Sequence, residues 1–147
     1  MSQEETAILC AGARARGMAD AFSLLGLPAV FIGPRGEVLH VGAEAAPLFG
    51  RAVAVDERRL VAGAAGAGLR LEEALRAAMA EGAEATVPLA TGQASLFAHV
   101  IPVPASPGQL LCAVVLLLES PDRAAAGLAA AAVARLAPRD SGPFLSH

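Results

Sequence analysis

The sequence predicts an α+β fold built on a five-stranded antiparallel sheet with helices on one face, plus N-terminal and C-terminal helices. Two short apolar runs joined by a tight turn lie early in the chain, and three longer runs follow a central helical stretch. Helix signals stand at both ends of the sequence. Two strands from one half and three from the other can pair into a single sheet with helices packed against it.

The first half of the chain predicts helices followed by a β-hairpin. Ser2 and Glu5 fit a capping box, in which the two side chains satisfy backbone donors at a helix start. Pro34 and Gly36 lie in the turn between two apolar runs, which we therefore expect to form a hairpin. The expected elements, in order, are a helix over residues 3–16, a helical stretch that Gly26 closes, strands over 28–33 and 37–41, and a short helical segment over 42–50.

The second half predicts a long helix and a β-meander. Leu71, Leu75 and Met79 recur every four residues, so they share one face of a helix. The glycines within residues 63–68 predict a flexible connector ahead of this helix, and Pro121 suits the first turn of a last helix. The expected elements, in order, are a brief strand over 60–62, a helix over 69–82, strands over 84–90, 95–103 and 109–119, and a helix over 120–137.

The last two predicted strands are apolar on both faces. Half-exposed strands alternate apolar with polar residues, whereas here both alternating sets in residues 95–103 and 109–119 are mainly apolar. The middle helices can cover one face only, and monomers seldom expose a large apolar patch. The N-terminal helix, a second copy of the chain, or both can cover the other face. We predict a homodimer through this outer sheet face and the N-terminal helix.

The composition is that of a folded domain with no marked affinity for nucleic acid. The chain has 147 residues, 55% of them hydrophobic and 17% charged, so it lacks the polar bias of disordered chains. Its net charge is −3, and no basic patch dominates. Aromatic residues make up 3% of the chain, which disfavours stacking on bases. We therefore expect no direct nucleic-acid binding by this chain.

The cysteines and the N-terminus predict a cytoplasmic protein. Cys10 and Cys112 lie far apart without a CxxC motif, which favours reduced thiols over a disulfide framework or a zinc site. The start MSQEETAIL lacks the basic region that opens a secretory signal. The most apolar stretch, residues 110–118, is far shorter than the roughly twenty residues of a membrane helix. We expect a buried strand there and no membrane association.

The stretch from about Met18 to Arg123 resembles a PAS domain. AFSLLGLPAVFIGPRGEVLHVGAEAAPLFG is similar to the opening of that family, with Gly36 in the hairpin turn and Gly50 closing the short helix. LRLEEALRAAMAEG resembles the long helix of the family, and FAHVIPVPASPGQLLCAVVLLLESPDR resembles its last two strands. The chain departs from the pattern at Gly42, where the family often has Asn after the second strand.

Among PAS domains, the sequence most resembles the PAS-like sensor that precedes the helix-turn-helix of LuxR-type bacterial regulators. Leu136-Ala-Pro-Arg-Asp140 looks like the LTPRE that opens that DNA-binding module, the rest of which is missing here. The sequence is compatible with a truncated regulator and with a stand-alone sensor. The resemblance implies an N-terminal helix over 1–17, a sensor domain over 18–120, and a C-terminal helix and tail over 121–147.

The resemblance also implies a sensory and dimerisation module with a small molecule between the inner sheet face and the middle helices. Ligand binding would change the helices at the ends of the domain, because a ligand shifts an equilibrium when it binds one state better. The ligand's identity stays open. The candidate lining residues occupy expected inward-facing positions of strands and helices, and they are Phe31, Leu39, Leu48, Leu75, Met79, Phe97, His99 and Val114.

Other functions find less support in the sequence. Neither cysteine lies in the helical motif of flavin-binding relatives, and residues 69–82 lack the histidine of haem-binding ones, so no metal site is expected. Glu72 and Glu73 point in different directions on a helix, and Glu72 with Arg76 forms an i,i+4 pair on its solvated face. We therefore expect no enzyme. The alternative function is a ligand-free dimerisation module with a solid core.

Overall fold

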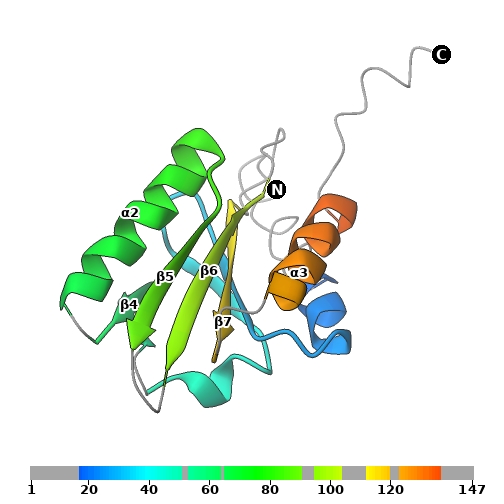
Figure 1. Ribbon diagram of the computed structural model, residues 1–147, viewed down its shortest axis with the longest axis horizontal. Helices are drawn as coiled ribbons and strands as arrows, with labels where there is room; N and C mark the ends of the chain where they lie inside the picture. Colours follow the sequence, from blue (N-terminus) through cyan, green and yellow to red (C-terminus); the bar gives the residue numbers. More distant parts are fainter. Residues whose placement is uncertain are drawn as a thin grey trace, which may run out of the picture.

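The computed structural model describes residues 17–50, 53–63, 65–90, 95–103, 112–119 and 123–136. They form an α+β fold in which helices pack against an antiparallel sheet (Figure 1). After helical turns over residues 17–24, the elements in order are β1 (Ala29–Ile32), β2 (Val38–Val41), η1 (Ala46–Leu48), β3 (Val53–Asp56), β4 (Arg59–Ala62), α2 (Ala65–Glu81), β5 (Ala85–Ala90), β6 (Leu96–Pro102), β7 (Ala113–Leu118) and α3 (Arg123–Leu136). The expected helix over residues 3–16 lies outside the described residues.

The main sheet has the five strands and the antiparallel pairing that the sequence predicts. The strand order is β2-β1-β7-β6-β5, so the N-terminal hairpin and the C-terminal meander join where β1 pairs with β7. Val30 lies opposite Val115 in that central pair, and Val100 lies opposite Val115 on the other side. Gly26, with a φ of 69°, ends the preceding helical turns in the left-handed conformation expected of it.

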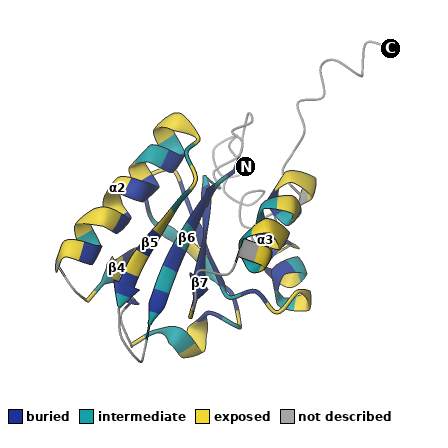
Figure 2. Ribbon diagram, viewed as in Figure 1, coloured by how far each residue is buried: buried dark blue, intermediate teal, exposed yellow. Residues whose placement is uncertain are grey.

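The centre of the sheet is buried on both faces, as the apolar alternation predicts. All six residues of β7 are buried, and they belong alternately to two hydrophobic clusters. The inner cluster lies between the sheet and α2, whereas the outer cluster lies under residues 17–24 and α3 (Figures 1 and 2). Ala129 and Val133 bring α3 onto the outer face, each at most 3% exposed. The chain therefore covers the centre of this face with residues 17–24 and α3, and the homodimer stays a prediction.

The segment before α2 differs from the expected connector. A two-stranded sheet of β3 and β4 occupies it, and α2 begins at Ala65, which places Gly66 and Gly68 inside the helix. Each glycine in a helix costs about 1 kcal/mol relative to alanine, but burial of Ala67 and Leu71 offsets this cost. In the part of the chain that the structure describes, no helix is long and apolar enough to cross a membrane.

The turn between β3 and β4 adopts a strained conformation. Glu57 and Arg58 have φ angles of 49° and 66°, a region that favours glycine and asparagine in two-residue hairpin turns. The turn is fastened to the main sheet, because the Val38 N–H donates to the Arg58 carbonyl and Glu37 forms a β-bridge with Arg59. The strained turn therefore holds the start of β4 against the β1–β2 turn.

Gly42 directly follows β2 and lies close to the backbone of β1. Its N–H donates to the Ala29 carbonyl over 2.8 Å, and a Cβ at this position would lie 2.9 Å from the same oxygen. Any larger residue would push the chain away from β1. The glycine at this position therefore has a local steric cause.

Relief of the strained turn should stabilise the protein. A non-glycine residue in the left-handed region costs about 1–2 kcal/mol, and glycine's own flexibility costs about 0.5–1 kcal/mol. We expect Arg58→Gly to raise the free energy of unfolding by about 0.5–1 kcal/mol in urea denaturation. Arg70→Gly, which makes the same change at an exposed site inside α2, should lower it by about 1 kcal/mol. A loss of stability in Arg58→Gly would refute the assignment of strain.

A methyl group at Gly42 should destabilise the fold, because it collides with backbone rather than with a movable side chain. We expect Gly42→Ala to lower the free energy of unfolding by about 1–3 kcal/mol, measured by urea denaturation. The matched control is Gly127→Ala in α3, where a Cβ meets nothing within 4 Å. That control should be stabilised by about 0.5–1 kcal/mol. Equal effects of both substitutions would contradict the role of close approach at Gly42.

Candidate functional site

A pocket opens at the edge of the inner core, where α2, β4 and the β1–β2 turn meet. Its volume is about 320 Å³, which falls at the small end of the range of about 300–1,000 Å³ for ligand pockets. Three segments that are distant in sequence build its wall. The lining residues are Pro34, Arg35, Gly36, Arg59, Leu60, Val61, Glu72, Leu75, Arg76 and Met79.

The floor of the pocket is apolar. Leu75 and Met79 come from successive turns of α2, and Leu60 comes from β4. Leu60 and Leu75 are 5% and 7% exposed and belong to the inner cluster, against which Met79 packs half-buried. A ligand on this floor would therefore extend the hydrophobic core outward.

The rim of the pocket is positively charged. Arg35, Arg59 and Arg76 carry three positive charges, against the single negative charge of Glu72, in a chain whose net charge is −3. Among the described residues, none of the three guanidinium groups forms an ion pair. The expected i,i+4 pair between Glu72 and Arg76 is thus not formed among the described residues. Both side chains are exposed, as expected for a solvated face of the helix, and both border the pocket.

The β1–β2 turn places two of these arginines. Gly36 has a φ of 79° and its N–H donates to the Gly33 carbonyl over 3.0 Å, which closes the turn as the sequence predicts. The backbone N–H of Arg35 donates to Glu37 Oε1 over 3.0 Å, which fixes the backbone of the turn at this residue. Arg59 lies directly over Gly36, because a Cβ there would come within 2.9 Å of Arg59 Nη1. Glycine therefore gives the turn its shape and leaves room for a guanidinium group.

Of the eight residues predicted to line a ligand cavity, the structure places two in the wall of this pocket. Leu75 and Met79 line the pocket, and Leu48 packs against the inner cluster without lining it. Leu39 is 36% exposed, because the β1–β2 register shifts at this point: Phe31 faces His40 and Ile32 faces Val38. Leu39 is thus the extra residue of a bulge, which turns it out of the pairing.

The other four predicted residues lie on the wrong face of the sheet for a cavity beside α2. Phe31 and Val114 are buried in the outer cluster, and Phe97 and His99 share that face as cross-strand neighbours of Leu118 and Leu116. Alternation shows which residues share a face, but it assigns the face only when one side is polar. Here both sides are apolar, so the sequence contained no signal for the choice.

Sequence reasoning also missed the arginines of the rim. Arg35 lies in a turn, Arg59 in a strand and Arg76 in a helix, so no spacing in the sequence connects them. The one sequence signal at this site was Gly36, because a glycine in the turn leaves room for the guanidinium group of Arg59.

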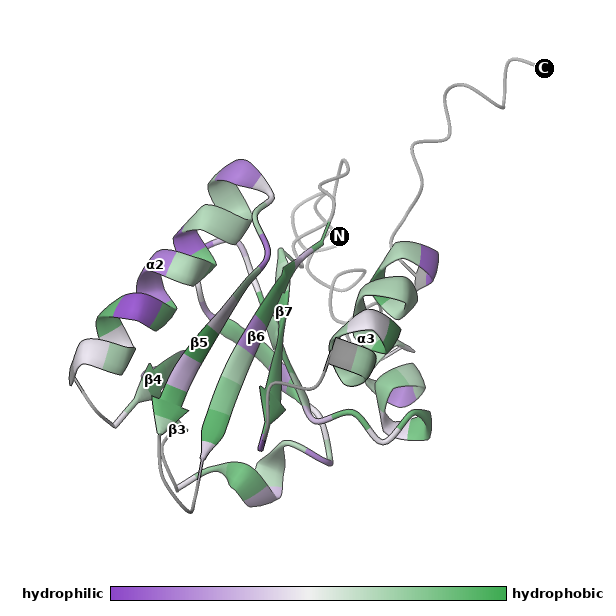
Figure 3. Ribbon diagram, viewed as in Figure 1, coloured by the Kyte–Doolittle hydropathy of each residue, from purple (hydrophilic) through white to green (hydrophobic). Residues whose placement is uncertain are grey.

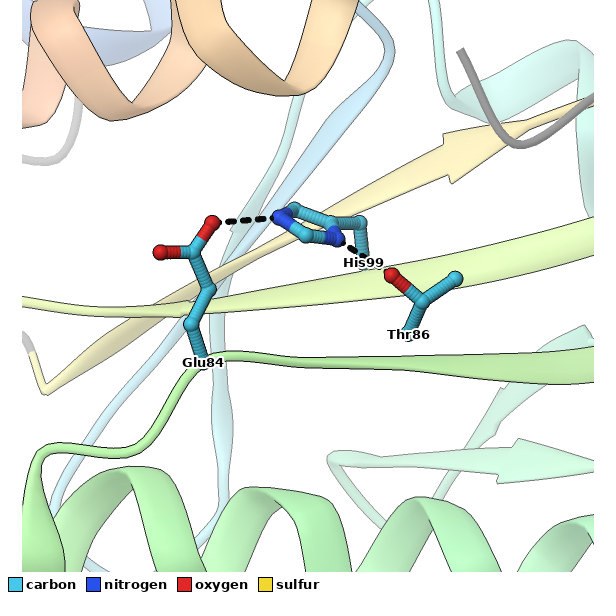
Figure 4. Close-up of polar contacts among 3 residues, drawn as sticks. All are labelled: Glu84, Thr86 and His99. Carbon is cyan, nitrogen blue, oxygen red and sulfur yellow. Dashed lines mark hydrogen bonds and ion pairs between the residues drawn. The ribbon is translucent and has the colours of Figure 1, made fainter. Parts of the chain in front are cut away.

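A second polar cluster joins β5 to β6 on the outer face. His99 lies between Thr86 and Glu84, with Nδ1 2.6 Å from Thr86 Oγ1 and Nε2 2.6 Å from Glu84 Oε1 (Figure 4). Hydroxyl, imidazole and carboxylate in this order also occur in nucleophilic catalysts. These side chains are not part of the arginine-rimmed pocket, and Thr86 and His99 are direct cross-strand partners. We interpret the cluster as a link that holds the edge strand β5 to the sheet.

A third feature is an apolar groove between residues 17–24 and α3. It has a volume of about 490 Å³ and is lined by Ala21, Leu24, Leu25, Leu128, Ala131, Ala132 and Arg135. Leu24 is 90% exposed and Leu128 is 51% exposed. Figure 3 shows that α3 is hydrophobic over most of its visible surface, in contrast to the hydrophilic outer side of α2. In the described part of the chain, no cluster of three His, Cys, Asp or Glu side chains could hold a metal ion.

Cys112 should react slowly with alkylating reagents. Burial raises the pKa of its thiol, and the negative charge of Glu37 raises it further. Because the thiolate is the nucleophile, we expect the pH–rate profile of iodoacetamide alkylation to lie at higher pH in the folded chain than in urea. The measurement uses a Cys10→Ser chain, so that Cys112 is the thiol observed. Coincident folded and unfolded profiles would contradict this assignment.

No protein-family model, no curated protein and no solved structure matches the chain. The PAS resemblance therefore stays a prediction from sequence style. What the described residues show is the α+β architecture with its five-stranded antiparallel sheet, a pocket rimmed by arginines, and an apolar groove on the opposite side of the sheet.

Proposed function

We propose that the protein is a sensory and dimerisation module of a bacterial transcription regulator or other signalling protein, and that it binds a small molecule. The observation that carries the proposal is the pocket whose floor of Leu60, Leu75 and Met79 continues the inner core. Ligand pockets combine such an apolar floor with a few convergent polar groups. The proposed ligand position is thus the edge between α2 and β4, not the space between α2 and the sheet.

Binding at this position would bridge three segments that are separate in the sequence. The pocket wall combines the β1–β2 turn, β4 and α2, so a ligand that contacts all three would favour the state in which they are close. The β1–β2 turn directly follows β1, whose residues alternate between the inner and outer clusters. A displacement of β1 would reach the helices of the outer face, where an output segment could respond.

A second candidate is the ligand-free interaction module. The apolar groove between residues 17–24 and α3 favours it, because exposed leucines such as Leu24 and Leu128 are typical of protein contacts. The continuous buried cluster between α2 and the sheet also agrees with a solid core. The two candidates differ in one observable property, which is whether the folded chain retains a small molecule.

Filling the pocket should abolish ligand retention. Val61 lines the pocket and is 38% exposed, so Val61→Trp can occupy it without disturbing the buried core. Val55→Trp is the matched control, since Val55 lies in the same hairpin, is 40% exposed and does not line the pocket. In native mass spectra of the purified chain we expect an added mass that disappears on denaturation. It should be lost in Val61→Trp and kept in Val55→Trp.

The same spectra can reject the proposal. A dimer without added mass in the wild-type chain would favour the interaction module. Retention of the added mass in Val61→Trp would show that any ligand binds elsewhere. Circular dichroism of both tryptophan variants establishes that the comparison is made between folded proteins.

A further inference from the structure

The arginine rim carries three positive charges against the single negative charge of Glu72. Arg35, Arg59 and Arg76 come from a turn, a strand and a helix, yet all three line one pocket of about 320 Å³. None of them forms an ion pair within the described residues. All three side chains are exposed, so solvent screens part of the repulsion between these like charges, and an anion bound at the rim would reduce it further.

The nearby carboxylates do not supply this anion. Glu37 Oε1 accepts the Arg35 N–H and lies against Gly33, where an added Cβ would overlap it. Glu72 borders the pocket one helical turn before Arg76, but no ion pair joins the two side chains among the residues described. The rim therefore keeps an excess of positive charge that is available to a ligand.

The chemistry of the guanidinium group narrows the class of ligand. Its planar set of donors matches carboxylate and phosphate oxygens in a bidentate arrangement. Beneath the rim, Leu60, Leu75 and Met79 offer a floor without charge. We infer that the pocket binds an amphipathic organic anion, with a carboxylate or phosphate group at the arginine rim and an apolar body on the floor formed by α2 and β4.

This inference rests on the proposed function, because it assigns a ligand class to the same pocket. Isothermal titration of the full chain with octanoate, octyl phosphate, octanamide and inorganic phosphate tests it. We expect at least one of the two amphipathic anions to bind at least tenfold more tightly than octanamide, which has the same chain length without the charge. Added salt should weaken the binding of that anion and leave octanamide unchanged.

A pair of variants separates the pocket from charge in general. Arg76→Gln removes one rim guanidinium from α2, and we expect it to weaken binding of the preferred anion about tenfold, as for loss of a charge-assisted hydrogen bond. Arg70→Gln makes the same change on the same helix at an exposed residue outside the pocket. We expect this control to bind the anion as the wild-type chain does.

The outcomes distinguish failure of the ligand class from failure of the pocket. Equal binding of octanamide and the anions would overturn the anionic class and support a neutral ligand in the same pocket. Inorganic phosphate that binds as tightly as octyl phosphate would overturn the apolar component. If no probe binds, a ligand that the wild-type chain retains and Val61→Trp loses would overturn only the inferred class. If no probe binds and no ligand is retained, both proposals fail.

Discussion

The antiparallel pairing of β1 with β7 joins the two halves of the chain at the centre of the sheet. Every residue of both strands is buried, and each strand supplies side chains to the inner and the outer cluster. A strand pair of this kind requires cover on both sides, because neither face carries polar groups that water could solvate. The layered architecture follows, with α2 on one face and residues 17–24 together with α3 on the other.

The position of the pocket is a consequence of how the inner face is covered. α2 packs across β5, β6 and β4, and the small β3–β4 sheet continues the cover beside it. The pocket lies at the seam where α2, this hairpin and the β1–β2 turn meet. The turn of Gly36 and the bridge between Glu37 and Arg59 hold this seam in place. The arginines at the seam are therefore held by backbone contacts of neighbouring residues rather than by pairing of their own charges.

The sequence contained enough information for the elements and the pairing of the main sheet, because turn residues such as Gly36 and long apolar runs such as β7 are local signals. It did not contain the assignment of faces. Phe31 and Val114 were expected beside α2 and lie on the outer side, since an apolar residue on either face of β1 or β7 looks the same in the sequence. The brief strand expected over 60–62 corresponds to β4, whereas its partner β3 was missed because VAVD is short and mostly exposed, with only Val53 buried. Convergence of Arg35, Arg59 and Arg76 is a tertiary property that no spacing records.

The two outer strands of the sheet affect how copies of this protein can meet. Pro88 lies in the edge strand β5 beside an irregularity in its register with β6, and proline has no amide hydrogen to offer to an approaching strand. At the opposite edge, the start of β2 already gives the Val38 N–H to the Arg58 carbonyl. Neither edge is a long, regular template for further strands, which protects a chain this rich in valine and leucine against growth into extended β-aggregates.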